Sequence, residues 1–162
     1  MLQLHAEGVQ NTMTNTQEIS RRSFIALSAT VALSGTALAQ SIDVSLKTGE
    51  LTPPEAYELS QNARILLIDI RRPDEWTTTG SAQGAHRLDM RRKDFVAALD
   101  TLVSGEKSMP VALICARGVR SDRMSRVLKN AGFTSIIDVP EGMLGSRSGP
   151  GWIKRGLPVN RG

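Results

Sequence analysis

Two short runs of apolar residues, each without a polar side chain, constrain the fold of this chain most strongly. They are Ile65–Ile68 and Val111–Ile114. Uninterrupted runs of this length are typical of strands that are buried on both faces of a parallel sheet. A third strand is predicted over 135–139. Segments with helical periodicity alternate with these strands, which predicts an α/β domain with a mainly parallel central sheet flanked by helices on both faces.

The helices of this domain are predicted from capping signals and periodicity. Thr52 precedes two prolines and Glu55, which is the pattern of a capping box, and the helix that begins there should end near Gln61. Further helices are expected over 94–103 and 121–131, the second of them ended by Gly132, and a short strand over 88–90. The residues expected to face the core from these two helices are Phe95, Ala98, Leu99, Leu102, Met124, Val127, Leu128 and Ala131.

The only cysteine, Cys115, directly follows the strand Val111–Ile114. It should therefore lie at the carboxyl end of a parallel strand, where ligands of such sheets bind, with its sulfur facing the start of the next helix. Free N–H groups and the helix dipole favour a thiolate and an anion there. A lone cysteine at such a position is often only a core residue, but the residues that follow it favour a reactive thiol exposed at the mouth of a cationic loop. These are Ala116, Arg117, Gly118, Val119 and Arg120.

Composition excludes several other kinds of site. A single cysteine cannot form an intramolecular disulfide or a multi-cysteine metal site. The only histidines, His5 and His86, have no partner at metal-ligand spacing, so we expect no metal and no cofactor. The formal net charge is +4, but the basic residues are scattered among acidic ones. We therefore expect a local anion site and no nucleic-acid partner.

The N-terminal segment has the features of an export signal. Arg21 and Arg22 precede Phe24 and an uncharged apolar stretch that ends in Ala37-Leu38-Ala39. This arrangement resembles a twin-arginine signal peptide, and the stretch is too short and too mildly apolar for a permanent membrane anchor. We expect a periplasmic protein with a signal over 1–39, cleavage after Ala39, a linker over 40–50 and one domain over 51–162. Whether translation starts at Met1 or Met13 stays open.

A stretch rich in glycine, Gly142–Gly151, is predicted to form a loop beyond the last strand. If this strand lies beside the cysteine strand, the loop borders the site. Arg147 is then either a second contact for an anion or an ordinary surface residue. Trp152 is expected to pack with Leu157 and Val159.

In combination, these features resemble those of a single-domain rhodanese, a sulfurtransferase. The resemblance covers about residues 51–159. It includes Leu67-Ile68-Asp69-Ile70-Arg71 with Glu75-Trp76, then Gly80 and Gly84-Ala85-His86, the six-residue loop Cys115–Arg120, and Trp152 with Gly156-Leu157-Pro158-Val159. The chain departs from the family pattern at Glu141-Gly142-Met143, where a paired glycine is usual, and in the glycine-rich insertion before Trp152.

The resemblance implies that Cys115 takes up a sulfane sulfur from a small anionic donor such as thiosulfate and passes it to a thiol or to cyanide. The amides of residues 116–120 would hold the persulfide, with Arg120 closing the ring and Arg117 binding the donor. Asp69, Arg71 and Glu75 would be structural, joining the end of the first strand to the following loop. One alternative is a non-catalytic sulfur carrier docked to a periplasmic redox protein. A cysteine-dependent phosphatase is disfavoured, because only four residues separate Cys115 from Arg120.

Overall fold

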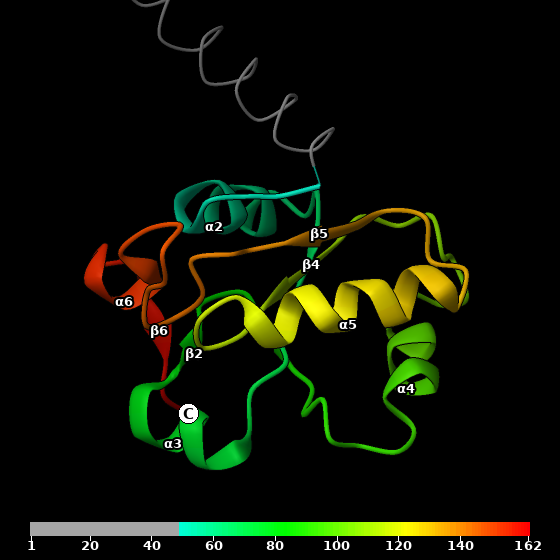
Figure 1. Ribbon diagram of the computed structural model, residues 1–162, viewed down its shortest axis with the longest axis horizontal. Coiled ribbons are helices and arrows are strands. Elements are labelled where there is room, and N and C mark those ends of the chain that lie inside the picture. The colour runs from blue at the N-terminus through cyan, green and yellow to red at the C-terminus, as the bar shows by residue number, and fades with distance from the viewer. Residues whose placement is uncertain (1–48) are drawn as a thin grey trace, which may run out of the picture. The chain divides into compact units, whose positions relative to one another are not determined.

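The structure, a computed structural model, describes residues 49–162 (Figure 1). The predicted signal over 1–39 and most of the predicted linker lie outside this range. A four-stranded parallel sheet has the order β3-β1-β4-β5, and a separate antiparallel pair joins β2 and β6. No helix of the described part is long and apolar enough to cross a membrane. The strands are β1 (Leu66–Asp69), β2 (Ser81–Ala82), β3 (His86–Arg87), β4 (Val111–Ile114), β5 (Ile136–Asp138) and β6 (Val159–Asn160).

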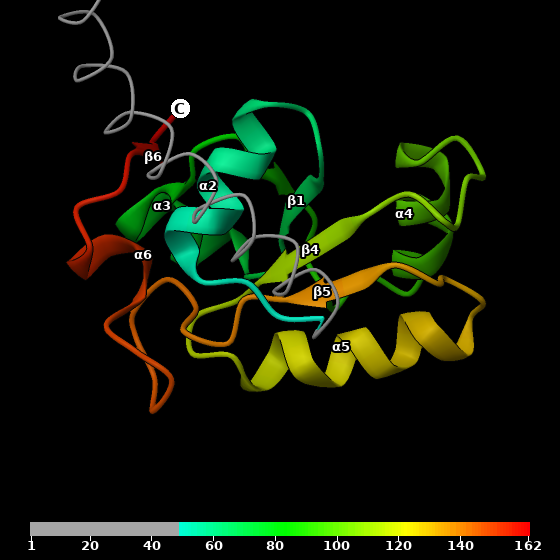
Figure 2. The same ribbon diagram turned by 90° about the horizontal axis from the view of Figure 1, so that it is seen from above.

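Helices cover both faces of the sheet, as the sequence predicts. The helices are α2 (Pro53–Gln61), α3 (Pro73–Thr79), α4 (Phe95–Leu102), α5 (Val119–Asn130) and α6 (Gly151–Lys154). Side chains alternate along a strand, so Ala112 and Ile114 of β4 join the core cluster that contains residues of α2 and α6, whereas Val111 and Leu113 join the cluster that contains residues of α4 and α5. Figure 2 shows α2 and α5 on opposite sides of the strands. Both apolar runs are therefore buried from two sides.

Most of the predicted elements are present, with shifted ends. α2 begins with the expected capping box, in which the Thr52 amide donates to the Glu55 carboxylate over 2.8 Å. α5 begins at Val119, two residues earlier than predicted, because Gly118 reverses the chain in one step with φ = +83°. The inward orientation predicted for Leu102 and Val127 is wrong, since these side chains are 41% and 48% exposed. Each helix presents only a stripe to the sheet, and both residues lie beside that stripe.

Two details of the sheet differ from the prediction. The short strand expected over 88–90 lies at His86–Arg87 instead, where it pairs with the end of β1. Gly49 and Glu50, which we assigned to the linker, pair with β5: the Gly49 carbonyl accepts from the Asp138 amide over 2.8 Å, and Glu50 forms a parallel bridge with Asp138. Gly49 and Glu50 thus belong to the edge of the sheet. Trp152 is fully buried and packs with Leu157 and Val159, as predicted.

A buried ion pair fixes the carboxyl end of β1. The guanidinium of Arg71 donates to both carboxylate oxygens of Asp69, with the shortest distance at 2.7 Å, and the two side chains are 1% and 0% exposed. Its remaining N–H groups donate to the Thr79 hydroxyl and the Gly80 carbonyl at the end of α3. The prediction that Asp69 and Arg71 join strand end to loop is confirmed.

Substitution of Arg71 should be strongly destabilising. In Arg71→Ala the Asp69 carboxylate stays buried without its counter-charge, so we expect the free energy of unfolding to fall by about 3–5 kcal/mol. Urea denaturation followed by tryptophan fluorescence measures the loss. Arg92→Ala is the matched control, because Arg92 also pairs with an aspartate two residues away but on the surface; it should cost less than about 1 kcal/mol. Equal losses in the two variants would contradict the role assigned to the buried pair.

Candidate active site

Cys115 lies at the carboxyl end of β4, at the predicted position, but its side chain is only 1% exposed. The expectation of an exposed thiol is therefore wrong. The residue belongs to the core cluster under α4 and α5, because β4 turns this position toward them. Its sulfur is 3.5 Å from the hydroxyl oxygen of Ser121, in the first turn of α5. That hydroxyl also lies 2.9 Å from the Gly118 carbonyl, and its single hydrogen can be donated to only one of the two at a time.

The backbone of the loop 115–120 is oriented by the segment that follows β5. The amide N–H groups of Met143 and Leu144 donate to the carbonyls of Cys115 and Ala116 over 2.8 and 2.9 Å. In a trans peptide the N–H points opposite to the C=O, so the amides of Ala116 and Arg117 point away from residues 143 and 144. Among the hydrogen bonds of residues 49–162, none uses the amide of Ala116, Arg117 or Gly118 as donor. Together with the free first-turn amides of α5, they form a cradle suited to an anion.

Two glycines permit this close approach. Gly142 has φ = +66°, and a Cβ there would lie 2.6 Å from the carbonyl oxygen of Ala116. Gly118 has φ = +83°, and its Cβ would lie 2.3 Å from the carbonyl oxygen of Pro140. Both contacts are with backbone atoms, which cannot move aside as a flexible side chain can. The two positions therefore require glycine for space as well as for φ.

Arg120 is held by a carboxylate from another element. Its two terminal nitrogens each lie 2.7 Å from a carboxylate oxygen of Glu75 in α3. This hydrogen bonding lowers the pKa of Glu75 to about 2 and raises that of Arg120, to which the neighbouring Cys115 also contributes. Glu75 thus contacts the cysteine loop, whereas the sequence suggested only a role next to β1. Glu75 thereby holds the Arg120 guanidinium close enough to Cys115 for the two side chains to interact.

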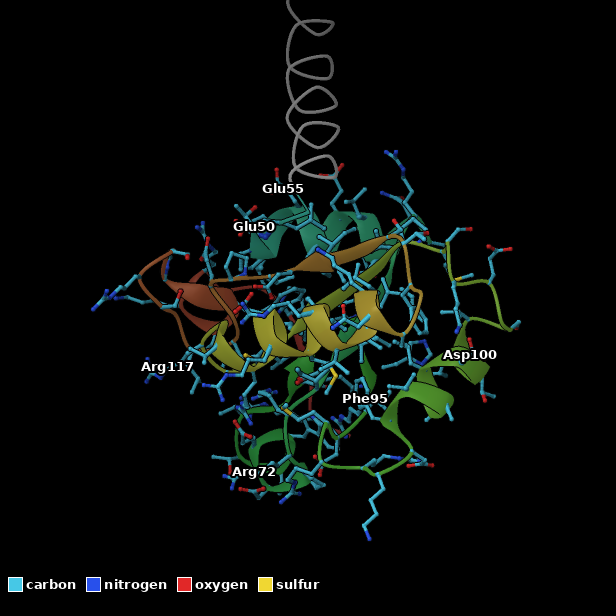
Figure 3. All side chains as sticks on the ribbon, turned by 45° about the vertical axis from the view of Figure 1, so that its right-hand side comes forward. Glu50, Glu55, Arg72, Phe95, Asp100 and Arg117 are labelled. Atoms are coloured by element: carbon cyan, nitrogen blue, oxygen red, sulfur yellow. The ribbon has the colours of Figure 1, made fainter. Side chains whose placement is uncertain are left out.

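The side chain of Arg117 contacts the glycine-rich loop. Figure 3 places it at the start of α5, next to the segment that leads into α6. One of its guanidinium nitrogens lies 3.3 Å from the Gly145 carbonyl. Its side chain lines a groove of about 470 Å³ with residues of that loop and with Lys154 of α6. Arg147 is exposed and is not among the residues that line this groove.

The glycine-rich loop is tightly bonded, although it contains no regular element. Glu141, 2% exposed, anchors it: its carboxylate accepts from the Gly151 amide over 2.9 Å and from the Arg155 guanidinium over 2.6 and 2.8 Å. The Ser146 hydroxyl donates to the Pro140 carbonyl over 2.8 Å. These hydrogen bonds hold the loop in a defined conformation beside Arg117.

Two polar residues at this edge of the sheet, Ser121 and Asp138, were not singled out from the sequence. Ser121 could have been found, because the first turn of a helix that begins at Gly118 faces back toward Cys115. Asp138 ends β5, the strand next to β4. One oxygen of its carboxylate is buried without a hydrogen-bond partner in the described part of the chain. Burial raises the pKa of Asp138 to about 6, and a hydrogen bond from Ser121 partly opposes the rise.

Metal ligands do not gather in this site. Within residues 49–162, no three His, Cys, Asp or Glu side chains lie close enough together to hold a metal ion. The chemistry available here is that of one thiol, the cradle of amide N–H groups and the arginines beside it.

Comparison with known proteins agrees with the geometry. Residues 52–146 match the rhodanese-like domain family, and the chain belongs to this family. It is 30% identical over 113 residues to thiosulfate sulfurtransferase GlpE of Glaesserella parasuis, covering 70% of this chain and 94% of that protein. Sulfurtransferase activity is thereby supported at the level of the family.

Two further matches cover a smaller share of the other protein's length. The chain is 30% identical over 128 residues to the tRNA uridine(34) hydroxylase of Chlamydia muridarum, and it spans about two fifths of the length of that relative, against 76% of its own. The crystal structure of a thiosulfate sulfurtransferase from Pseudomonas aeruginosa superposes with a TM-score of 0.56 at 21% identity, covering 78% of this chain and 22% of that one. This second likeness concerns the fold.

The Glu75–Arg120 pair should make stability depend on pH in acid. The folded-state pKa of Glu75 is depressed from 4.5 to about 2, so its contribution is present above pH 4.5 and is lost as the pH falls toward 2. Because both side chains are partly exposed, we expect Glu75→Gln to lower the free energy of unfolding by about 1 kcal/mol at pH 7 and by much less near pH 2.5. Urea titrations at the two pH values measure this. Asp74→Asn, on the same turn but 66% exposed, is the control, and a pH-independent loss in Glu75→Gln would contradict the assignment.

Asp138 should have the opposite pH dependence. Its pKa is raised from 3.8 to about 6, so the folded protein binds the extra proton between these values and loses stability as the pH rises through them. Asp138→Asn removes the cost of the buried charge. We expect this variant to be about 1 kcal/mol more stable than the parent at pH 8 and no more stable at pH 4, as measured by urea denaturation. A variant that is less stable at pH 8 would show that the ionised carboxylate has a partner.

Proposed function

We propose that this member of the rhodanese-like family is a sulfurtransferase that carries sulfur as a persulfide on Cys115, taking it from a small anionic donor such as thiosulfate and giving it to a thiol or cyanide. The observation that carries the proposal is the cradle of unpaired amides around the end of β4. A persulfide sulfur lies about 2.05 Å beyond the cysteine sulfur, which extends the buried side chain toward the first turn of α5. Its negative charge then meets N–H groups that have no other acceptor among residues 49–162.

Each half-reaction is a displacement at sulfur. The Cys115 thiolate attacks the outer sulfur of thiosulfate, the S–S bond of thiosulfate breaks, and sulfite leaves with the electron pair. The acceptor thiolate or cyanide then attacks the outer sulfur of the persulfide, and the Cys115 thiolate leaves. No external oxidant or reductant is needed, since sulfur moves between nucleophiles. A covalent intermediate of this kind gives ping-pong kinetics.

The residues around the cysteine support distinct parts of this cycle. Arg120, held in place by Glu75, supplies a guanidinium group that can interact with the anionic persulfide. The Ser121 hydroxyl can donate a hydrogen bond to a deprotonated sulfur or accept one from a protonated sulfur. Gly118 and Gly142 keep the cradle open to the anion by letting the backbone segments approach one another. Arg117 lies farther along the loop, where it meets the part of the substrate that does not react.

Intact-mass spectrometry of the full chain after incubation with thiosulfate tests the proposal. We expect a mass gain of one sulfur atom that is reversed by cyanide and absent from Cys115→Ser, because that variant has no thiol to accept sulfur. Circular dichroism of Cys115→Ser should match the parent. Ser125→Ala, which changes a buried hydroxyl elsewhere on α5, is the matched control and should still gain sulfur. A gain from polysulfide but not from thiosulfate would favour the carrier alternative, and no gain from either donor would refute the persulfide.

A further inference from the structure

We propose that the groove between Arg117 and Lys154 binds the carboxylate end of a small organic thiol that exchanges sulfur with Cys115. The inference rests on the proposed function for its role and names the class of acceptor. It also concerns Lys154, a residue outside the cysteine loop. The groove is lined by one basic side chain from the cysteine loop, one from α6, and five residues of the glycine-rich loop, Leu144, Gly145, Ser146, Gly149 and Pro150.

The charge of the groove is positive and uncompensated. Its charged lining residues are Arg117 and Lys154, with no acidic residue among the lining. Neither takes part in an ion pair among the described residues. The nearby acid, Glu141, is buried and already paired with Arg155. Two unpaired cations that face one groove favour an anionic ligand.

The size of the groove admits an organic anion larger than thiosulfate. At roughly 30 Å³ for each water-sized group, the five heavy atoms of thiosulfate would fill about 150 Å³. The groove measures about 470 Å³ and is open to solvent. It therefore has room for a carboxylate-bearing thiol the size of a short peptide.

The groove borders the cysteine loop, because Arg117 of that loop lines it. Arg117 is two residues from Cys115, so their backbones are at most about 7 Å apart. In the proposed complex, a thiol of tripeptide length, which spans up to about 10 Å, directs its sulfur toward the cradle and places a carboxylate against the basic residues of the groove. In the transfer step, the acceptor thiolate attacks the outer sulfur of the Cys115 persulfide. The Cys115 thiolate leaves, and the organic persulfide forms.

Hydrogen bonds within the protein already hold the loop that lines the groove in the absence of a ligand. Leu144 is hydrogen-bonded to the cysteine loop, and the Ser146 amide donates to the Gly149 carbonyl over 2.9 Å. The Arg117 guanidinium, bonded once to Gly145, keeps its other N–H groups for a carboxylate. Binding therefore requires little ordering of the loop.

A binding measurement that needs no sulfur transfer tests the site. The full chain is titrated with S-methylglutathione, an unreactive thioether with two carboxylates, and with its dimethyl ester, by nitrogen-15 NMR. We expect the acid to shift the amides of Gly145, Ser146 and Lys154, and the ester to bind at least about fivefold more weakly. Lys154→Ala should weaken binding of the acid about fivefold to tenfold, whereas Arg147→Ala, which removes the same charge from outside the groove, should change it less than twofold.

The outcomes separate this inference from the proposed function. Shifts elsewhere, equal binding of the ester, or equal losses in the two variants would overturn the site, whether or not Cys115 forms a persulfide. Where the persulfide forms in the intact-mass experiment, glutathione should discharge it at least about fivefold faster than 2-mercaptoethanol at equal thiolate concentration. Lys154→Ala should remove that preference. A preference unchanged in Lys154→Ala would overturn the role of the groove in transfer.

Discussion

The two hydrogen bonds from Met143 and Leu144 to the carbonyls of Cys115 and Ala116 are the interactions on which the candidate site depends. They connect the end of β4 to the segment after β5, and they fix the direction of the peptide groups beside the sulfur. With the carbonyls turned outward, the amides are left for an anion. Gly118 and Gly142 are required because these backbones lie closer than any Cβ would allow. The cradle thus forms because the segments that follow β4 and β5 are hydrogen-bonded to each other.

Around this cradle, two glutamate carboxylates hold arginine side chains in place, and each glutamate belongs to a segment that other polar contacts hold in place. Glu75 belongs to α3, which the buried Asp69–Arg71 pair ties to the end of β1. Glu75 in turn holds Arg120 beside the sulfur. Glu141 holds Arg155 and the glycine-rich loop, which leaves Arg117 and Lys154 as the free cations of the groove. Arg120 is therefore held near the thiol by its carboxylate partner, whereas Arg117 is available to bind a carboxylate in the groove.

Asp138 is an acidic residue of this region whose pKa is raised by burial. It ends the strand next to β4, and one buried oxygen of its carboxylate has no hydrogen-bond partner among residues 49–162. A carboxylate whose pKa is about 6 changes its charge within the range in which proteins ordinarily operate.

The sequence by itself determined the class of fold and the position of the thiol. Buried strands need continuous apolar runs, and a parallel sheet places the residue after such a run at its ligand-binding edge, so Ile65–Ile68, Val111–Ile114 and Cys115 could be assigned locally. Local patterns cannot show which charged groups meet across the chain. The pairing of Arg120 with Glu75, 45 residues away, the turn of Arg117 toward Gly145 and the burial of Cys115 were decided only by tertiary packing. These contacts join elements distant in sequence, and their partners are selected by geometry that no local spacing encodes.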